Sequence, residues 1–129
     1  MAVNTAYTVN NASQAADPPN FATGRITYPA TAITAADFTV INLGFTPRYV
    51  CWTNVTSRIE IEWFEGMAAN TCIKGAAAGT RTLETSNGGI TICDADGTAN
   101  TSGKAFKVLQ NATLAAILAS EVVNWRAEG

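Results

Sequence analysis

The sequence contains no histidine, and this is its most informative absence. Histidine is the most common general base, a frequent metal ligand and the usual activator of serine and cysteine nucleophiles. Without it, neither a Ser–His nor a Cys–His catalytic pair can form. We therefore expect a protein that is not an enzyme, with no catalytic residues and no cofactor.

Charged residues are also scarce. Only 14% of the 129 residues are charged, and eight basic and ten acidic side chains give a net charge of −2. An ordinary soluble domain has about 25% charged residues. No run of Lys or Arg offers a binding surface for a phosphate backbone, so we expect no nucleic-acid partner. A surface poor in charge repels its neighbours weakly, which favours a protein that is packed in an assembly.

Long apolar stretches are missing as well. The longest candidate, residues 112–119, falls far short of the roughly 18–20 residues needed to span a bilayer. The first seven residues have neither the basic region nor the apolar region of a secretion signal. These absences predict a soluble protein that is made in the cytoplasm and has no membrane partner.

Metal and disulfide sites have little support. The three cysteines, Cys51, Cys72 and Cys93, are odd in number and show no C-x-x-C spacing, so we expect buried, reduced thiols. Residues 94–97 (Asp-Ala-Asp-Gly) resemble the start of a calcium loop, but the Glu required at its twelfth position would fall at Ala105. We therefore predict a plain turn at 94–97 and no metal site.

What the sequence does contain is a series of short β-type segments separated by turns. The clearest is 58–63 (Arg-Ile-Glu-Ile-Glu-Trp), whose period of two predicts a strand with one apolar and one charged face. The apolar face would comprise Ile59, Ile61 and Trp63, and the charged face Arg58, Glu60 and Glu62. Further strands are expected at 25–28, 38–43, 48–55, 71–74, 80–85, 90–93, 104–109 and 122–127.

Residues 111–120 are the only helical candidate, either as one short helix or as a helical loop that covers one end of the sheets. Asn111 could cap a short run in which Leu114, Ile117 and Leu118 have helical spacing. Eight or nine strands with at most one short helix predict an all-β fold: a single antiparallel β-sandwich or barrel, jelly-roll-like, over residues 21–129.

Residues 1–20 differ from the rest and are predicted to form an extended N-terminal arm. The segment is rich in Asn, Ala, Thr and Ser, and it ends in Asp-Pro-Pro-Asn, which suits neither a helix nor a central strand. We expect it to be ordered by contacts with a partner. The residues expected to contact a partner, on the arm and on the charged strand face, are Tyr7, Val9, Pro18, Pro19, Phe21, Arg58, Glu60 and Glu62.

Several segments of the chain resemble small proteins encoded among the virion genes of tailed bacteriophages. They are residues 44–50, 61–68, 86–90, 103–108 and 125–127, and the most specific is Glu-Trp-Phe-Glu-Gly-Met-Ala at 62–68. The resemblance spans residues 40–127 and does not cover the N-terminal segment or the polar insertion at 94–102.

The resemblance implies a virion structural protein, and within that class a capsid decoration (cement) protein. Such proteins sit on the outer capsid surface as homotrimers or homodimers and bridge neighbouring major capsid subunits. The expected partners are therefore the major capsid protein and further copies of this chain, and the expected location is the virion. The protein would be made in the cytoplasm of the bacterial host.

Two other functions remain open at this point. A host-attachment module of a tail or head fibre could bind carbohydrate through exposed aromatics such as Trp52 or Tyr49, although we expect Trp52, Trp63 and Trp125 to be core aromatics. A hydrolase could use Glu62 or Glu65, but a general acid needs a desolvated carboxyl group, and the alternation places Glu62 on an outer strand face.

Overall fold

The computed structural model describes residues 20–30, 37–100 and 102–129. Within this part of the chain there are nine β-strands and no helix, so the fold is all-β, as predicted. The strands are β1 (Phe21–Thr27), β2 (Phe38–Asn42), β3 (Tyr49–Asn54), β4 (Ile59–Phe64), β5 (Cys72–Gly75), β6 (Arg81–Glu84), β7 (Ile90–Cys93), β8 (Ala105–Leu109) and β9 (Val122–Glu128). Each coincides with an expected segment to within a few residues.

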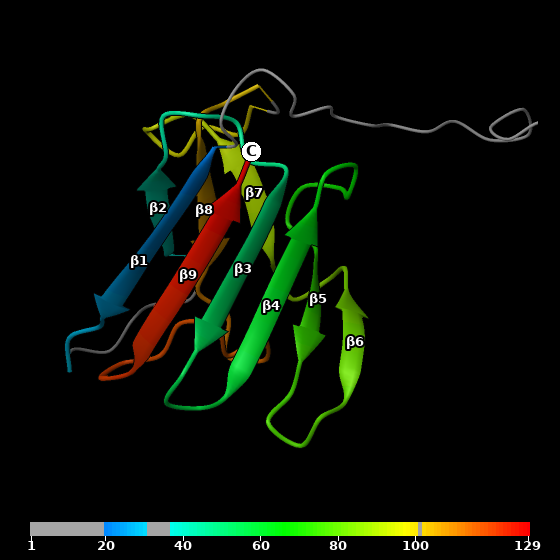
Figure 1. Cartoon of the computed structure of the whole chain (residues 1–129). Helices are drawn as coiled ribbons and strands as arrows, with labels where there is room; N and C mark the ends of the chain where they lie inside the picture. Colours follow the sequence, from blue (N-terminus) through cyan, green and yellow to red (C-terminus); the bar gives the residue numbers. More distant parts are fainter. Residues whose placement is uncertain (1–19, 31–36, 101) are drawn as a thin grey trace, which may run out of the picture.

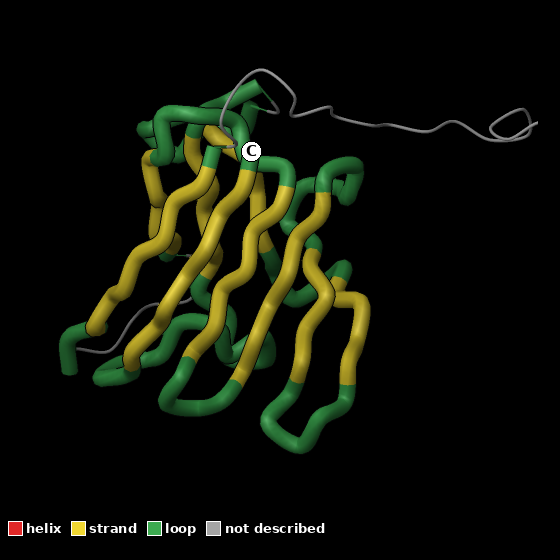
Figure 2. The backbone as a smooth tube through the Cα atoms, in the orientation of Figure 1, coloured by secondary structure: helices red, strands yellow, loops and turns green. Residues whose placement is uncertain are grey.

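The strands form two antiparallel sheets that pack face to face as a β-sandwich (Figure 1). The larger sheet has the order β1-β9-β3-β4-β5-β6, and the smaller one has the order β2-β8-β7. Strands distant in sequence lie side by side: β1 pairs with β9 over seven residues, and β2 pairs with β8. The tube in Figure 2 shows the six-stranded sheet as one broad layer in front of the smaller one.

The core between the sheets is built around aromatic side chains. Trp52 and Phe106 are fully buried and meet edge to face, with ring centroids 6.1 Å apart. Trp125 also packs edge to face against Phe106, with ring centroids 5.7 Å apart. The expected aromatic core is therefore present, and its contacts are T-shaped rather than stacked, which suits the quadrupoles of the rings.

Gly24 makes room for one of these rings at the edge of the sheet. It lies opposite Trp125 in the β1–β9 register, and a Cβ atom built at this position would be 2.5 Å from the indole. Any larger residue would have to displace the ring. The glycine thus allows the indole to cover the backbone of an edge strand.

Of the two forms expected at 111–120, the segment takes the loop and not the helix. Asn111 Oδ1 accepts hydrogen bonds from the backbone N–H groups of Thr113 (2.8 Å) and Leu114 (3.1 Å), as a capping residue would. The turn stops at Ala115, whose φ is +59°. Leu114 and Ile117 are buried from a loop that closes one end of the core, which is the second of the two forms expected here, and loop burial can mimic helical spacing.

The predicted alternation of β4 is confirmed with one correction. Ile61 and Trp63 are buried, whereas Glu60 and Glu62 lie on the opposite face of the strand. Arg58 was expected on the same face, but it precedes the strand and has a φ of +62°. A left-handed residue closes the β3–β4 turn, so Arg58 does not share the strand's face.

This turn is organised by a buried asparagine. Asn54 is fully buried, and its Oδ1 accepts the backbone N–H groups of Thr56 (3.1 Å) and Ser57 (3.0 Å). Its Nδ2 donates to Glu121 Oε2 (3.3 Å), which also accepts the Ser57 hydroxyl (2.7 Å). The side chain therefore joins the β3–β4 turn to the segment that leads into β9.

Candidate functional site

The candidate site is the outer face of the six-stranded sheet, the side turned away from the core. Cross-strand register arranges its side chains in three rows. The first row is Phe21, Glu128, Tyr49 and Phe64; the second is Thr23, Arg126, Cys51, Glu62, Ile73 and Leu83; the third is Arg25, Asn124, Thr53, Glu60, Gly75 and Arg81. We call this surface the outer face.

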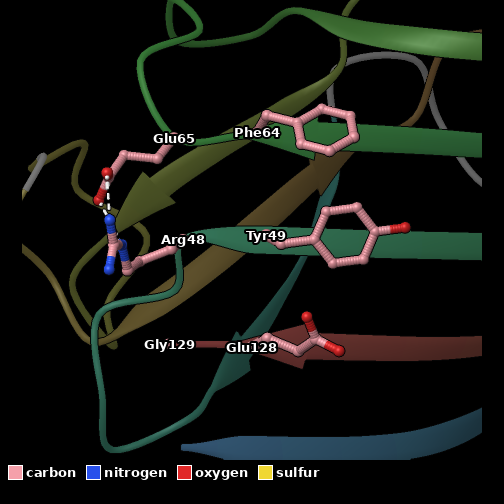
Figure 3. Close-up of a pocket in the computed structure, with 6 residues that line it drawn as sticks. All are labelled: Arg48, Tyr49, Phe64, Glu65, Glu128 and Gly129. Atoms are coloured by element: carbon pink, nitrogen blue, oxygen red, sulfur yellow. Dashed lines mark hydrogen bonds and ion pairs between the residues drawn. The ribbon is translucent and has the colours of Figure 1, made fainter. Parts of the chain in front are cut away.

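The first row carries exposed aromatic side chains. Phe21 is 57% exposed and Phe64 is 43% exposed. Between them, Tyr49 contacts Phe64 with ring centroids 5.1 Å apart and tilted by 54°. Figure 3 shows Tyr49, Phe64 and Glu128 projecting side by side from three neighbouring strands. An open depression of about 350 Å³ lies beside them, lined by Arg48, Tyr49, Phe64, Glu65, Glu128 and Gly129.

A hydrogen-bonded polar network crosses the centre of the outer face. The Tyr49 hydroxyl donates to Glu62 Oε2 at 2.7 Å, and Arg81 Nη2 donates to Glu62 Oε1 at 2.7 Å. The guanidinium of Arg126 lies over the Tyr49 ring, 5.7 Å from its centroid. These residues come from β3, β4, β6 and β9, so the network holds the polar groups of four strands in place.

The network also shifts the pKa values of two of its members, Glu62 and Tyr49. The hydrogen bond from Arg81, followed by that from Tyr49, lowers the pKa of Glu62. The pKa of Tyr49 is raised above its usual range, first by burial and then by its bond to Glu62. Glu62 is consequently held as a carboxylate whose oxygens are both engaged.

The other acidic residue considered for catalysis behaves in the same way. Glu65 receives two hydrogen bonds of 2.9 Å from Arg48, and this pairing lowers its pKa. A general acid needs a raised pKa so that it keeps its proton near neutrality. The geometry of Glu62 and Glu65 therefore gives no support to glycoside hydrolysis.

The residues predicted to contact a partner are divided by the structure. Phe21, Glu60 and Glu62 lie on the outer face, whereas Arg58 lies in a turn outside its rows. The remaining four, Tyr7, Val9, Pro18 and Pro19, lie outside the described residues.

Three further members of this surface, Phe64, Arg81 and Arg126, were not predicted from the sequence. Phe64 could have been found, because it follows Trp63 and the period of two assigns it to the same face as Glu62. The positions of Arg81 and Arg126 depend on strand pairing, which the alternation does not reveal.

Carbohydrate binding through Trp52 does not fit the structure. Trp52 is fully buried, and its indole Nε1 donates to the carbonyl of Ala116 at 3.0 Å. Trp52 faces the core on β3, as expected of a core aromatic, so the alternative of a Trp52 sugar platform has no support. Tyr49 lies on the outer face and is half-buried.

The cysteines are all free thiols, but they do not share one environment. Cys72 and Cys93 are buried as expected, and burial raises the pKa of Cys72 to about 12. Cys51 is half-buried on the outer face, beside Thr53. The prediction of a buried thiol is therefore wrong for Cys51, because its strand position points away from the core.

Residues 94–97 form a turn, as predicted. Gly97 N donates to the Asp94 carbonyl at 2.9 Å, and the Asp96 carboxylate accepts the Thr98 N–H at 2.9 Å. Among the described residues, no three His, Cys, Asp or Glu side chains are grouped so as to hold a metal ion. Over the same ranges, no helix has the length and apolar character needed to cross a membrane.

Comparisons of this chain with protein families, with curated proteins and with solved structures gave no match. What can be inferred about function therefore comes from the residues and geometry of the chain itself.

Proposed function

We propose that this chain is a structural protein of a tailed-bacteriophage virion that decorates the outer capsid surface and stabilises contacts between major capsid subunits. In this proposal the outer face of the six-stranded sheet is the binding surface, and the protein performs no catalysis. The observation that carries the proposal is the row of aromatic side chains, Phe21, Tyr49 and Phe64, on that face.

The composition of the outer face suits protein binding. Interface cores are enriched in aromatic residues and arginine, and a few such residues supply most of the binding energy. Phe21 and Phe64 provide apolar area that a partner would remove from water, at about 25 cal/mol per Å². Two arginines are also held on this face: Arg126 lies over the Tyr49 ring, and Arg81 is bonded to Glu62.

The polar network also lowers the penalty for burying this face. Covering an unpaired charge costs several kcal/mol, whereas a charge that is already paired and hydrogen-bonded is less expensive to desolvate. Glu62 is bonded on both oxygens before any partner arrives. A partner surface could therefore cover the centre of the outer face without supplying a countercharge.

Binding to capsids tests the proposal directly. Replacing Phe21 and Phe64 together with serine should weaken binding to empty capsids by at least about tenfold, because two hot-spot aromatics would be lost. The measurement is occupancy as a function of protein concentration after co-sedimentation. Both side chains are exposed, so the variant should remain folded.

The matched control is Phe38→Ser. Phe38 is 47% exposed, but it lies on β2 in the other sheet. This variant should bind like the wild type. Equal binding by the wild type and the double variant would contradict the role of the outer face.

Two features of the proposal concern assembly. Homotrimers or homodimers would bind more tightly than a monomer because several weak contacts act together, and light scattering after size exclusion measures the oligomeric state.

Residues 1–20 are proposed to contact a neighbouring subunit, so deleting residues 2–17 should reduce capsid occupancy. Unchanged occupancy would remove the arm from the mechanism and leave the outer face as the binding surface.

A further inference from the structure

The two edges of the large sheet differ in how well they are protected. β1 lies at one edge and β6 at the other (Figure 1). β6 is four residues long and carries Arg81 and Glu84, and short, charged edge strands resist pairing with another chain. β1 has seven residues, pairs with β9 without a bulge and contains one charged residue, Arg25. Within the part of the chain that the structure describes, no strand pairs with the other side of β1, so this edge can accept a further strand.

Backbone hydrogen bonds at the two ends of β1 show which of its groups point away from β9. The Asn20 carbonyl accepts the N–H of Gly129 at 3.0 Å. At the other end, Tyr28 N donates to the Glu121 carbonyl at 3.0 Å. Bonded pairs alternate in an antiparallel ladder, so the even-numbered residues of β1 bond to β9. The residues whose N–H and C=O groups point outward from the edge are Phe21, Thr23, Arg25 and Thr27.

A second, antiparallel copy of β1 would match these outward groups completely. In a pair centred on Gly24, Phe21 of each copy lies opposite Thr27 of the other. In the same register Thr23 of each copy lies opposite Arg25 of the other, so no two like charges are directly opposite. All the outward N–H and C=O groups of both strands are then bonded, whereas any shifted register leaves some of them unpaired.

The centre of β1 adds a contact between side chains. A Cβ atom built on Gly24 would lie 2.5 Å from the Trp125 indole, so the ring covers this glycine. Opposed residues of a non-bonded pair have Cα atoms about 4.5 Å apart. Two glycines at that distance bring the two half-buried indoles together. On the same face, Ala22 of each copy lies opposite Ile26 of the other, which forms an apolar pair.

We infer that this chain forms a homodimer in which two copies of β1 pair about a two-fold axis and join their large sheets into one. The axis is perpendicular to the sheet, so the outer faces of both copies lie on the same side. Self-association is part of the proposed function, and the inference rests on that part alone. It selects the homodimer over the homotrimer, because one strand that pairs with itself closes the assembly at two copies.

Mass and amide hydrogen exchange test the dimer on the full chain, without capsids. Light scattering after size exclusion should give twice the mass of one chain. NMR-detected exchange should be at least about tenfold slower in the dimer than after dilution to the monomer for the amides of Thr23, Arg25 and Thr27. The amides of Ala22 and Gly24 should be protected in both states, because they bond to β9.

A proline on each edge provides a variant and its matched control. Thr23→Pro removes an outward N–H, and proline is tolerated on an edge strand where the N–H faces solvent, so the fold should be retained. Both copies lose a hydrogen bond, and the dissociation constant of the dimer should rise at least about tenfold.

Leu83→Pro makes the same change on β6. The bonded Ala76–Thr80 pair fixes the alternation there, so the N–H of Leu83 also points outward. This control should dimerise as the wild type does, and far-ultraviolet circular dichroism checks that both proline variants are folded.

A charge exchange tests the register without altering the backbone. Thr23→Arg places a guanidinium opposite Arg25 of the other copy and should weaken the dimer. Adding Arg25→Glu turns this repulsion into an attraction, so the double variant should recover dimerisation. Both side chains are exposed, so folding should be unaffected. Arg126 lies opposite Thr23 within one copy and is common to both variants, so the recovery reports the contact between copies.

Several results would overturn the inference. A monomer at all concentrations or a mass of three chains would do so. A dimer whose odd-numbered β1 amides exchange fast, or one that Thr23→Pro leaves intact, would place the contact on another surface. Protected odd-numbered amides in a monomer would mean that the chain covers its own edge.

These outcomes are distinguishable from a failure of the proposed capsid binding. A β1 dimer that does not bind capsids would remove the proposed function and leave the inference standing. Capsid binding by a chain that stays monomeric would remove the inference and leave the outer face as the binding surface.

Discussion

Replacing Asn54 with alanine should destabilise the protein by about 2–4 kcal/mol. The side chain is fully buried and makes three hydrogen bonds, two to the turn and one to Glu121. A net hydrogen bond contributes about 1 kcal/mol, and a donor left unpaired in the interior costs about 1–3 kcal/mol. Thr56 is exposed, so water can bond to its N–H when the asparagine is removed. The expected destabilisation therefore lies near the sum of the three lost hydrogen bonds, without the further cost of an unpaired donor at Thr56.

Urea denaturation measures this change, provided that the m-value stays constant. A difference below about 0.5 kcal/mol would refute the reasoning, because that is the range of neutral surface substitutions. It would mean that the turn reorganises without its asparagine.

A second substitution at the same position gives an independent check. Asn54→Asp keeps an oxygen for the N–H groups of Thr56 and Ser57, but it places a second carboxylate beside Glu121. Like charges repel when both are ionised, so this variant should be destabilised at pH 7 and approach the wild type as the pH falls. A difference from the wild type that does not change with pH would show that the contact with Glu121 is unimportant.

Three further predictions concern the sheet and its outer face. Glu62→Gln should reduce the loss of folding stability that occurs at low pH. Arg81 lowers the pKa of Glu62 in the folded state. The stabilisation that Glu62 provides is therefore present above its pKa in the unfolded chain and is lost as the pH falls through its pKa in the folded protein. The check is urea denaturation of both proteins from pH 6 to pH 3, and parallel curves would contradict it. Gly24→Ala should cost about 1–3 kcal/mol because its Cβ displaces the Trp125 indole, and altered near-ultraviolet circular dichroism would report the moved ring. Cys51 should be the first thiol to react with a maleimide in the native protein, and Cys51→Ser should remove that fast phase; a fast phase that persists would place the reactive thiol elsewhere.

The candidate site was only partly predictable from the sequence. The alternation in β4 assigned Glu60 and Glu62 to one face, and the same rule extends to Phe64. Arg58 was misassigned because a single left-handed residue at the start of the strand breaks the alternation. The period of two predicts which face of the sheet each side chain occupies, and this rule holds only for residues within the strand.

The sequence by itself determined that this chain is built from strands, and approximately where each one lies. The alternation of apolar and polar residues and the turn residues between them are local signals, so they need no knowledge of the partner strand. Local spacing did not decide between a helix and a loop at 111–120, where Leu114 and Ile117 are buried from a loop. Apolar spacing reports burial, and a loop packed on the core buries side chains as effectively as a helix.

Only the tertiary structure decided which strands are neighbours, and therefore which side chains meet. The pairing of β1 with β9 brings Phe21 into the row of Tyr49, and the β4–β5–β6 order brings Arg81 to Glu62. The β1–β9 pairing joins segments that are far apart in the chain, and the energy that selects it comes from packing the whole core. The sequence of a single strand therefore does not identify the strand with which it pairs.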